Sequence, residues 1–224
     1  MRVIATHEYV KNFIKHTGDK LPMVIGKCLD DTVSKMVYFK NRHIINRDIT
    51  IKALRSYTAL LKDELHKNCI SLENSDLRYY YAMGWKFINA FKKSVIYENS
   101  LLRDRTRIII INDEAGIYAQ PDFVDYENKT IYEMKSFSLK PLPEYVRLQA
   151  RVFQLAYPDF KTVLIAFPRD QDYIKVQNIK LREYKDVTKN RLLREIYNFT
   201  MQNGRDMDMF TAIGNRKYIK YKLD

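Results

Sequence analysis

The chain has 224 residues, enough for one domain with an accessory region. Its 39 lysines and arginines against 27 aspartates and glutamates leave a net charge of +12, which predicts a polyanionic partner such as nucleic acid. The absence of a signal peptide, a lipidation motif and an apolar run of transmembrane length excludes secreted and membrane-spanning classes, so we expect an intracellular protein that does not bind membranes.

The first seventy residues predict helices at about 7–16, 23–39 and 50–68. The clearest is the last of these, where apolar residues recur at the i, i+3 and i+4 spacing of a packed helix. We therefore expect residues 1–75 to form a helical region packed on a core at 76–170, with residues 171–224 completing the same domain. Only six glycines and six prolines argue against a long flexible linker.

A further helix is predicted at 76–93. It is unusual in charge, because no Asp, Glu or His occurs from Leu77 to Tyr97. Tyr79, Tyr80 and Tyr81 follow Arg78 and form a candidate patch for stacking on bases, although aromatic residues at helical spacing more often belong to a core.

Three strands are predicted next, at 107–112, 116–126 and 130–137, with a polar turn at 127–129 between the last two. A two-residue loop at 127–128 would place Asp122 opposite Glu133, whereas a loop at 128–129 would pair Asp122 with Lys135. Because side chains alternate along a strand, all three residues share one face in either register.

The remaining elements are a helix at 144–157, an apolar strand at 162–167, a strand at 173–180 and a basic helix at 186–202. The basic and aromatic segment 215–224 is compatible with a strand, a DNA-binding arm or a dimer contact.

The polar face of the hairpin suits a metal site that cuts phosphodiesters. Mg²⁺ is a hard cation commonly held by one or two carboxylates, with water and substrate phosphate in its other positions. A nearby lysine can orient or help deprotonate the attacking water, or stabilise developing negative charge. A solvated hairpin with one cross-strand ion pair is the simpler alternative.

Pro121-Asp122 and Glu133-x-Lys135 resemble the motif of the PD-(D/E)xK nuclease superfamily, and the order helix, three strands, helix, strand is that of its core. The resemblance implies an α/β fold with a restriction-endonuclease-like core, Asp122 and Glu133 as metal ligands and Lys135 as the catalytic lysine. The helix that follows contains a Gln-x-x-x-aromatic pattern beginning at Gln149, which resembles the RecB-like branch of the superfamily. This resemblance implies an active-site role for Gln149. Tyr157 and Gln154 are further candidates.

Many members carry an additional Glu or His on the helix before the core strands, but helix 76–93 contains neither. The nearest carboxylate, Glu98, is therefore the candidate third metal ligand, with a plain surface charge as the alternative. The two cysteines, Cys28 and Cys69, exclude the four-cysteine iron–sulfur cluster found in some RecB-like exonucleases.

The sequence thus predicts a nuclease that hydrolyses DNA with Mg²⁺ or Mn²⁺ as cofactor. The resemblance, with a composition rich in Tyr, Ile and Lys, also suggests recombination or repair proteins of archaea and their viruses, including Holliday-junction resolvases. A resolvase needs two active sites and hence a homodimer. Two alternatives are a non-catalytic DNA-binding protein on a degenerate nuclease core and a protein whose basic charge serves an acidic protein partner.

Overall fold

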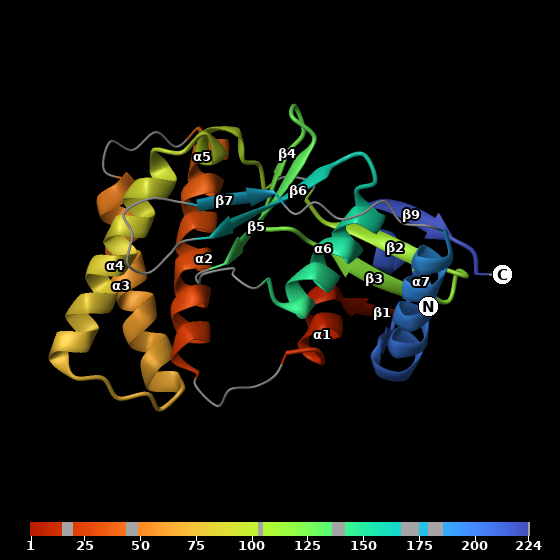
Figure 1. The fold of residues 1–224 in the computed structure, drawn as a ribbon, viewed down its shortest axis with the longest axis horizontal. Helices are drawn as coiled ribbons and strands as arrows, with labels where there is room; N and C mark the ends of the chain where they lie inside the picture. Colours follow the sequence, from red (N-terminus) through yellow and green to blue (C-terminus); the bar gives the residue numbers. More distant parts are fainter. Residues whose placement is uncertain are drawn as a thin grey trace.

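The protein is an α/β structure with a helical region and two mixed β-sheets, arranged from left to right in Figure 1. The computed structural model describes residues 1–14, 20–43, 49–102, 105–135, 142–166, 175–178 and 186–223. Within this part of the chain, no helix is both long enough and apolar enough to cross a membrane.

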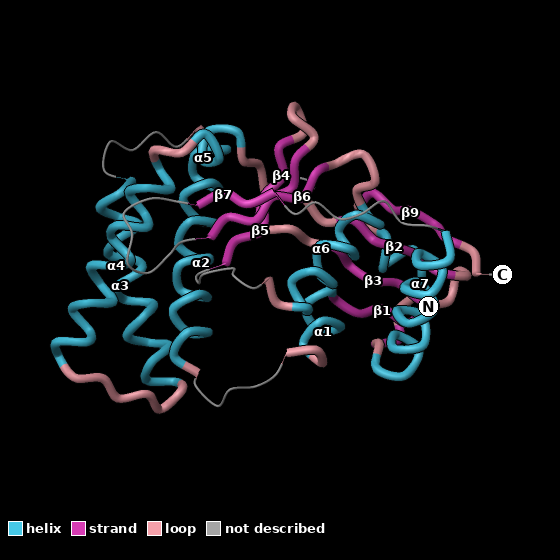
Figure 2. The backbone as a smooth tube through the Cα atoms, in the orientation of Figure 1, coloured by secondary structure: helices cyan, strands magenta, loops and turns pink. Residues whose placement is uncertain are grey.

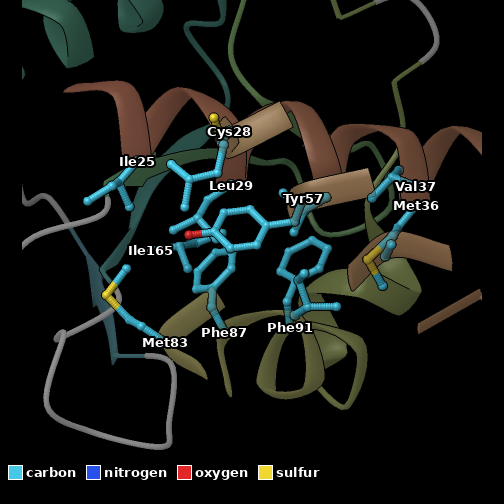
Figure 3. Close-up of a cluster of buried hydrophobic side chains, with 14 of the residues drawn as sticks. Ile25, Cys28, Leu29, Met36, Val37, Tyr57, Met83, Phe87, Phe91 and Ile165 are labelled. Carbon is cyan, nitrogen blue, oxygen red and sulfur yellow. The ribbon is translucent and has the colours of Figure 1, made fainter. Parts of the chain in front are cut away.

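The helical region contains α2 (Leu21–Asn41), α3 (Ile49–Lys67), α4 (Asn74–Lys92) and the short α5 (Val95–Asn99). The three long helices lie within two residues of their predicted bounds. Each turns one apolar stripe inward, because apolar residues recur every three or four positions. Figure 3 shows the resulting core, in which Leu29, Tyr57 and Phe87 come from three different helices.

Sheet A holds five strands in the order β8-β1-β3-β2-β9. Their bounds are β1 (Arg2–Ala5), β2 (Arg107–Ile111), β3 (Ala115–Ala119), β8 (Arg205–Asp206) and β9 (Lys217–Tyr221). Helices α1 (Thr6–Lys11), α7 (Asp186–Asn203) and α8 (Met209–Ile213) pack near it. The first and last strands of the chain both belong to this sheet, so it forms only when distant segments meet.

Sheet B holds four strands in the order β4-β5-β6-β7. They are β4 (Phe123–Asp125), β5 (Thr130–Lys135), β6 (Lys161–Ala166) and β7 (Lys175–Asn178). Alternate residues face opposite sides: Phe123 and Val163 join the helical core, whereas Val124 and Ile131 join a second core with helix α6 (Glu144–Ala156). Sheet B therefore lies between the helical region and α6, as Figure 2 also shows.

The single strand predicted at 116–126 is wrong, because the chain divides there into β3 and β4, which enter different sheets. The break is Gln120-Pro121-Asp122, and proline is poorly suited to a continuous central strand because it has no N–H to donate. The described strands therefore form two sheets rather than one.

Two further predictions need correction, both in the first seventy-five residues. The region 1–75 is not wholly helical, since it begins with β1, and the first helix ends at Lys11, with residues 15–16 of its predicted range outside the described residues. The predicted strand 173–180 is described only over Lys175–Asn178. The C-terminal ends of the predicted strands 130–137 and 162–167 also lie outside the described residues. Of the alternatives for 215–224, the strand is found, because β9 pairs in parallel with β2.

Candidate active site

The register of β4 and β5 brings the predicted carboxylates together. Phe123 lies opposite Tyr132 and Asp125 opposite Thr130, which is the register centred on 127–128. Asp122 immediately precedes β4, so its position in this register is opposite Glu133. Its carboxylate accepts a hydrogen bond from the backbone N–H of Met134 at 2.6 Å, which anchors the side chain at the end of the ladder.

Glu133, Lys135 and Gln149 form a closed set of contacts. Lys135 Nζ lies 2.7 Å from Glu133 Oε1. The Gln149 side chain bonds both partners: Nε2 donates to Glu133 Oε1 at 2.8 Å, and Oε1 accepts from Lys135 Nζ at 3.1 Å. The Lys135 and Glu133 side chains are 14% and 8% exposed, so this ion pair is largely removed from water.

Burial makes the charges in this cluster strongly interdependent. The pKa of Asp122 is raised well above its usual value, first by burial and then by repulsion from Glu133 and Asp30. Burial alone would lower the pKa of Lys135, but the attraction of Glu133 and Asp122 outweighs it and raises that pKa. Lys135 is therefore an ammonium ion at neutral pH.

Asp30 is the residue that sequence reasoning missed. It lies on α2, ninety-two positions before Asp122, yet the two carboxylates repel each other. Burial is the largest cause that raises the pKa of Asp30 to about 6, and repulsion from Glu133 follows. Asp30 lies on α2, two helices before the helix at 76–93 on which the sequence motif leads one to expect a further acidic residue.

Glu98 is not brought to this cluster. Its side chain is exposed on α5, and its charge acts on Lys40 of α2. Lys40 Nζ also donates to the backbone carbonyl oxygens of Tyr97, Glu98 and Ser100. Glu98 thus belongs to the junction between α2 and the end of α5, and the surface-charge alternative describes it better than the role of metal ligand.

Tyr157 is linked to Asp122 through Arg105. Its hydroxyl donates to the carbonyl oxygen of Arg105, and an Arg105 N–H in turn donates to the carbonyl oxygen of Asp122. The Arg107 guanidinium lies over the Tyr157 ring, 3.9 Å from its centroid. The ring itself is fully buried, so Tyr157 has no surface to offer a substrate.

Tyr145 is a second residue not predicted from sequence. It lies one helical turn before Gln149 on α6, and residues at i and i+4 share a helix face. Burial raises the pKa of its phenol, and the charges of Lys135 and Glu133 act on it in opposite directions. The spacing from Gln149 was the available signal for this position.

The carboxylates suit a hard divalent cation in their chemistry. Two buried oxygens, Glu133 Oε2 and Asp30 Oδ1, have no hydrogen-bond partner among the described residues. Buried carboxylate oxygens without a partner are costly, and a cation would satisfy them. In the described part of the chain no three His, Cys, Asp or Glu side chains already converge on one point, so the fit is to the one or two carboxylates that Mg²⁺ commonly uses.

The cysteines take no part in this cluster. Cys28 is buried in the helical core, Cys69 is exposed, and both are free.

Comparison with known proteins adds little to this geometry. No protein-family model and no curated protein sequence matches the chain. Among solved structures, the crystal structure of SSO0001 is similar over 90% of this chain and 84% of that one, with 15% sequence identity and a TM-score of 0.37. A similarity this distant names no family.

Proposed function

We propose that the protein is a metal-dependent nuclease that hydrolyses DNA phosphodiester bonds, with Asp122, Glu133, Lys135, Gln149 and Asp30 as its active cluster. The observation that carries the proposal is the buried contact of Lys135 with Glu133 and Gln149, beside two carboxylates whose pKa values are raised. Perturbed titratable groups gathered at one place are typical of functional sites.

A purely structural reason for this cluster is weak. Removing a carboxylate and an ammonium from water costs several kcal/mol for each ion, and apolar residues of similar volume often stabilise a fold as well or better. Here three carboxylates influence one another, while the positive charges are Lys135, which acts on all three, and Arg105, which acts on Asp30. Such an excess of buried negative charge is expensive to maintain without a cation.

Asp122 and Glu133 would hold the metal, and Asp30, rather than Glu98, would add a third negative charge near them without being a third ligand. Their oxygen donors are those that Mg²⁺ and Mn²⁺ prefer. When bound, such an ion supplies Lewis acidity toward the phosphate and a lowered pKa for the attacking water.

Lys135 acts as a cation in this proposal. Because its pKa is raised, it carries its proton at neutral pH and donates hydrogen bonds, so it can orient the water or stabilise charge on the phosphate. Of the roles considered for this lysine, deprotonation of the water fits least. Gln149 keeps the ammonium and the Glu133 carboxylate in place.

DNA as substrate is supported by charge and by resemblance. The net charge of +12 favours a polyanion, and phosphate contacts provide much of the affinity of proteins for nucleic acids. The resemblance of Pro121-Asp122 and Glu133-x-Lys135 to the PD-(D/E)xK motif adds the reaction type.

The test is cleavage of labelled single-stranded, duplex and four-way-junction DNA with Mg²⁺, Mn²⁺ or EDTA. Asp122→Asn and Lys135→Met are the matched variants. Asn keeps an oxygen that can accept from the Met134 N–H and removes one of the repelling charges, so this variant should fold at least as well as the wild type. Thermal unfolding of both variants controls for folding.

We expect products that require the metal and that disappear in both variants. Cleavage at the wild-type rate by purified Lys135→Met would show that the assignment is wrong. DNA binding without cleavage of any substrate would instead support a DNA-binding protein on a degenerate nuclease core.

A further inference from the structure

The outward face of helix α4 combines positive charge with exposed aromatic rings. Six exposed residues define this α4 stripe: Arg78, Tyr79, Trp85, Lys86, Lys92 and Lys93. At 100° per residue they span about 140° of the helix circumference, and from Arg78 to Lys93 the stripe is roughly 22 Å long. It is therefore one continuous face of the helix.

Packing determines that this face points outward. The opposite side of α4 carries Met83, Phe87 and Phe91, which are buried in the helical core (Figure 3). At Gly84 the helix approaches α3 so closely that an added Cβ would lie 2.0 Å from a Tyr57 ring atom. Helix α4 cannot rotate about its axis without losing these contacts, so the stripe stays exposed.

The segment of α4 that carries the stripe contains no carboxylate of its own after Asp76. Between Leu77 and Tyr97 the chain has four cations and no carboxylate. Asp76 lies in the first turn of the helix, and Glu98 lies beyond its end beside Lys40. A solvated helix face normally intersperses both signs, which gains stability from pairs at i and i+4.

Two aromatic side chains lie within this charge. Trp85 is 42% exposed and Tyr79 is 52% exposed. Aromatic rings beside cations are the combination that single-stranded nucleic acids use, because unpaired bases stack on the rings while phosphates meet the lysines.

We propose that the α4 stripe binds single-stranded nucleic acid, with Trp85 and Tyr79 stacking on bases and the lysines contacting phosphates. A duplex offers only its phosphates to such a face, because its bases are already stacked. An anionic membrane would favour large aliphatic side chains between the lysines, whereas the exposed aliphatic residue on this part of α4 is Ala82.

The stripe is mechanically connected to the active cluster. The Phe91 ring on the inner side of α4 lies 5.6 Å from the ring of Phe123, centroid to centroid, and Phe123 directly follows Asp122. A strand held on α4 would thus be held on the same packed unit as the carboxylates. This connection to cleavage rests on the proposed function, whereas binding at the stripe does not.

Trp85 is the chain's single tryptophan, so its fluorescence reports on the stripe alone. The experiment titrates the full chain carrying Asp122→Asn, in EDTA, with a labelled twenty-residue oligothymidylate. The quenching of Trp85 fluorescence and the anisotropy of the oligonucleotide label are followed together. We expect quenching that saturates, and at least about five-fold weaker binding in Trp85→Leu, since stacking on one base is worth roughly 1–3 kcal/mol.

Charge is tested by Lys92→Gln/Lys93→Gln against the matched control Lys161→Gln/Lys222→Gln, which removes two exposed lysines outside α4. The stripe variant should bind the oligonucleotide at least about five-fold more weakly, and the control less than about two-fold, at the same salt concentration. Equal losses in the two variants would overturn the proposal.

Other outcomes also decide. Binding detected by anisotropy without a change in Trp85 fluorescence would place the nucleic-acid strand elsewhere on the protein. Quenching by phosphatidylserine vesicles but not by the oligonucleotide would identify a membrane-binding surface. Either result overturns the inference. Quenching by DNA in a protein that cleaves no substrate would defeat only the proposed nuclease. Cleavage with no response of Trp85 would defeat only the stripe.

Discussion

Gln149 Nε2 donates a hydrogen bond to Glu133 Oε1 across 2.8 Å, and this bond joins helix α6 to strand β5. The same amide accepts from Lys135, so one uncharged side chain holds both members of the buried ion pair. In the proposed nuclease, Gln149 would orient Glu133 and Lys135, and residues that orient metal ligands commonly have large effects on metal affinity or activity.

We therefore expect Gln149→Leu to lower the rate of DNA cleavage by about 10- to 100-fold, because Glu133 and Lys135 lose their common partner. Single-turnover rates at saturating metal measure the effect. Glu144→Gln is the control on the same helix, because Glu144 is exposed, and it should cleave close to the wild-type rate. A Gln149→Leu enzyme as fast as the wild type would contradict the orienting role.

The third carboxylate is decided by comparing Asp30→Asn with Glu98→Gln. Asp30 acts electrostatically on Asp122, whereas Glu98 is exposed and acts on Lys40. Asp30→Asn should raise the metal concentration needed for half-maximal cleavage by at least about ten-fold, since one negative charge beside the proposed ligands Asp122 and Glu133 is lost. Glu98→Gln should leave it unchanged. The reverse result would restore Glu98 as the ligand.

The raised pKa of Asp30 also predicts how the stability of the fold depends on pH, which can be tested without enzyme activity. Its pKa rises from 3.8 to about 6 on folding, so the folded state binds this proton more tightly than the unfolded chain. The contribution to stability is therefore greatest at low pH and is lost as pH rises through this window, up to about 3 kcal/mol for two pKa units.

Asparagine at position 30 removes the free-energy cost of burying an ionised carboxylate at high pH. In EDTA at pH 8 we expect Asp30→Asn to raise the free energy of unfolding by about 1–3 kcal/mol, and by much less near pH 4. Urea unfolding at both pH values measures the difference, with Glu98→Gln as a variant that should show none. A pH-independent effect of Asp30→Asn would mean that its carboxylate is not buried among like charges.

Gly84 supplies a test of the packing that orients α4. Alanine is favoured over glycine in a helix by about 1 kcal/mol, but a Cβ at this position would overlap the Tyr57 ring. We expect Gly84→Ala to lower the free energy of unfolding by roughly 2 kcal/mol, in the range of overpacked cores. The loss caused by Gly84→Ala should be smaller in a Tyr57→Leu background than in the wild type, and equal losses in the two backgrounds would locate the strain elsewhere.

Much of the site could be predicted because it is local. Asp122, Glu133 and Lys135 lie within fourteen residues on one hairpin, so the period of two along a strand and the position of the turn limit their relative placement. The three long helices were found within two residues for a similar reason, because each carries its own apolar periodicity.

The tertiary structure alone decided the rest, since it depends on contacts between segments far apart in the sequence. The sequence pattern predicts one strand where the structure has β3 and β4. The division becomes apparent only from their partners, because β3 pairs with β1 and β4 pairs with β5. Asp30 reaches the cluster because α2 packs against sheet B, and no local pattern near residue 30 indicates a partner at residue 122. Periodicity specifies which face of an element is apolar; packing specifies what that face meets.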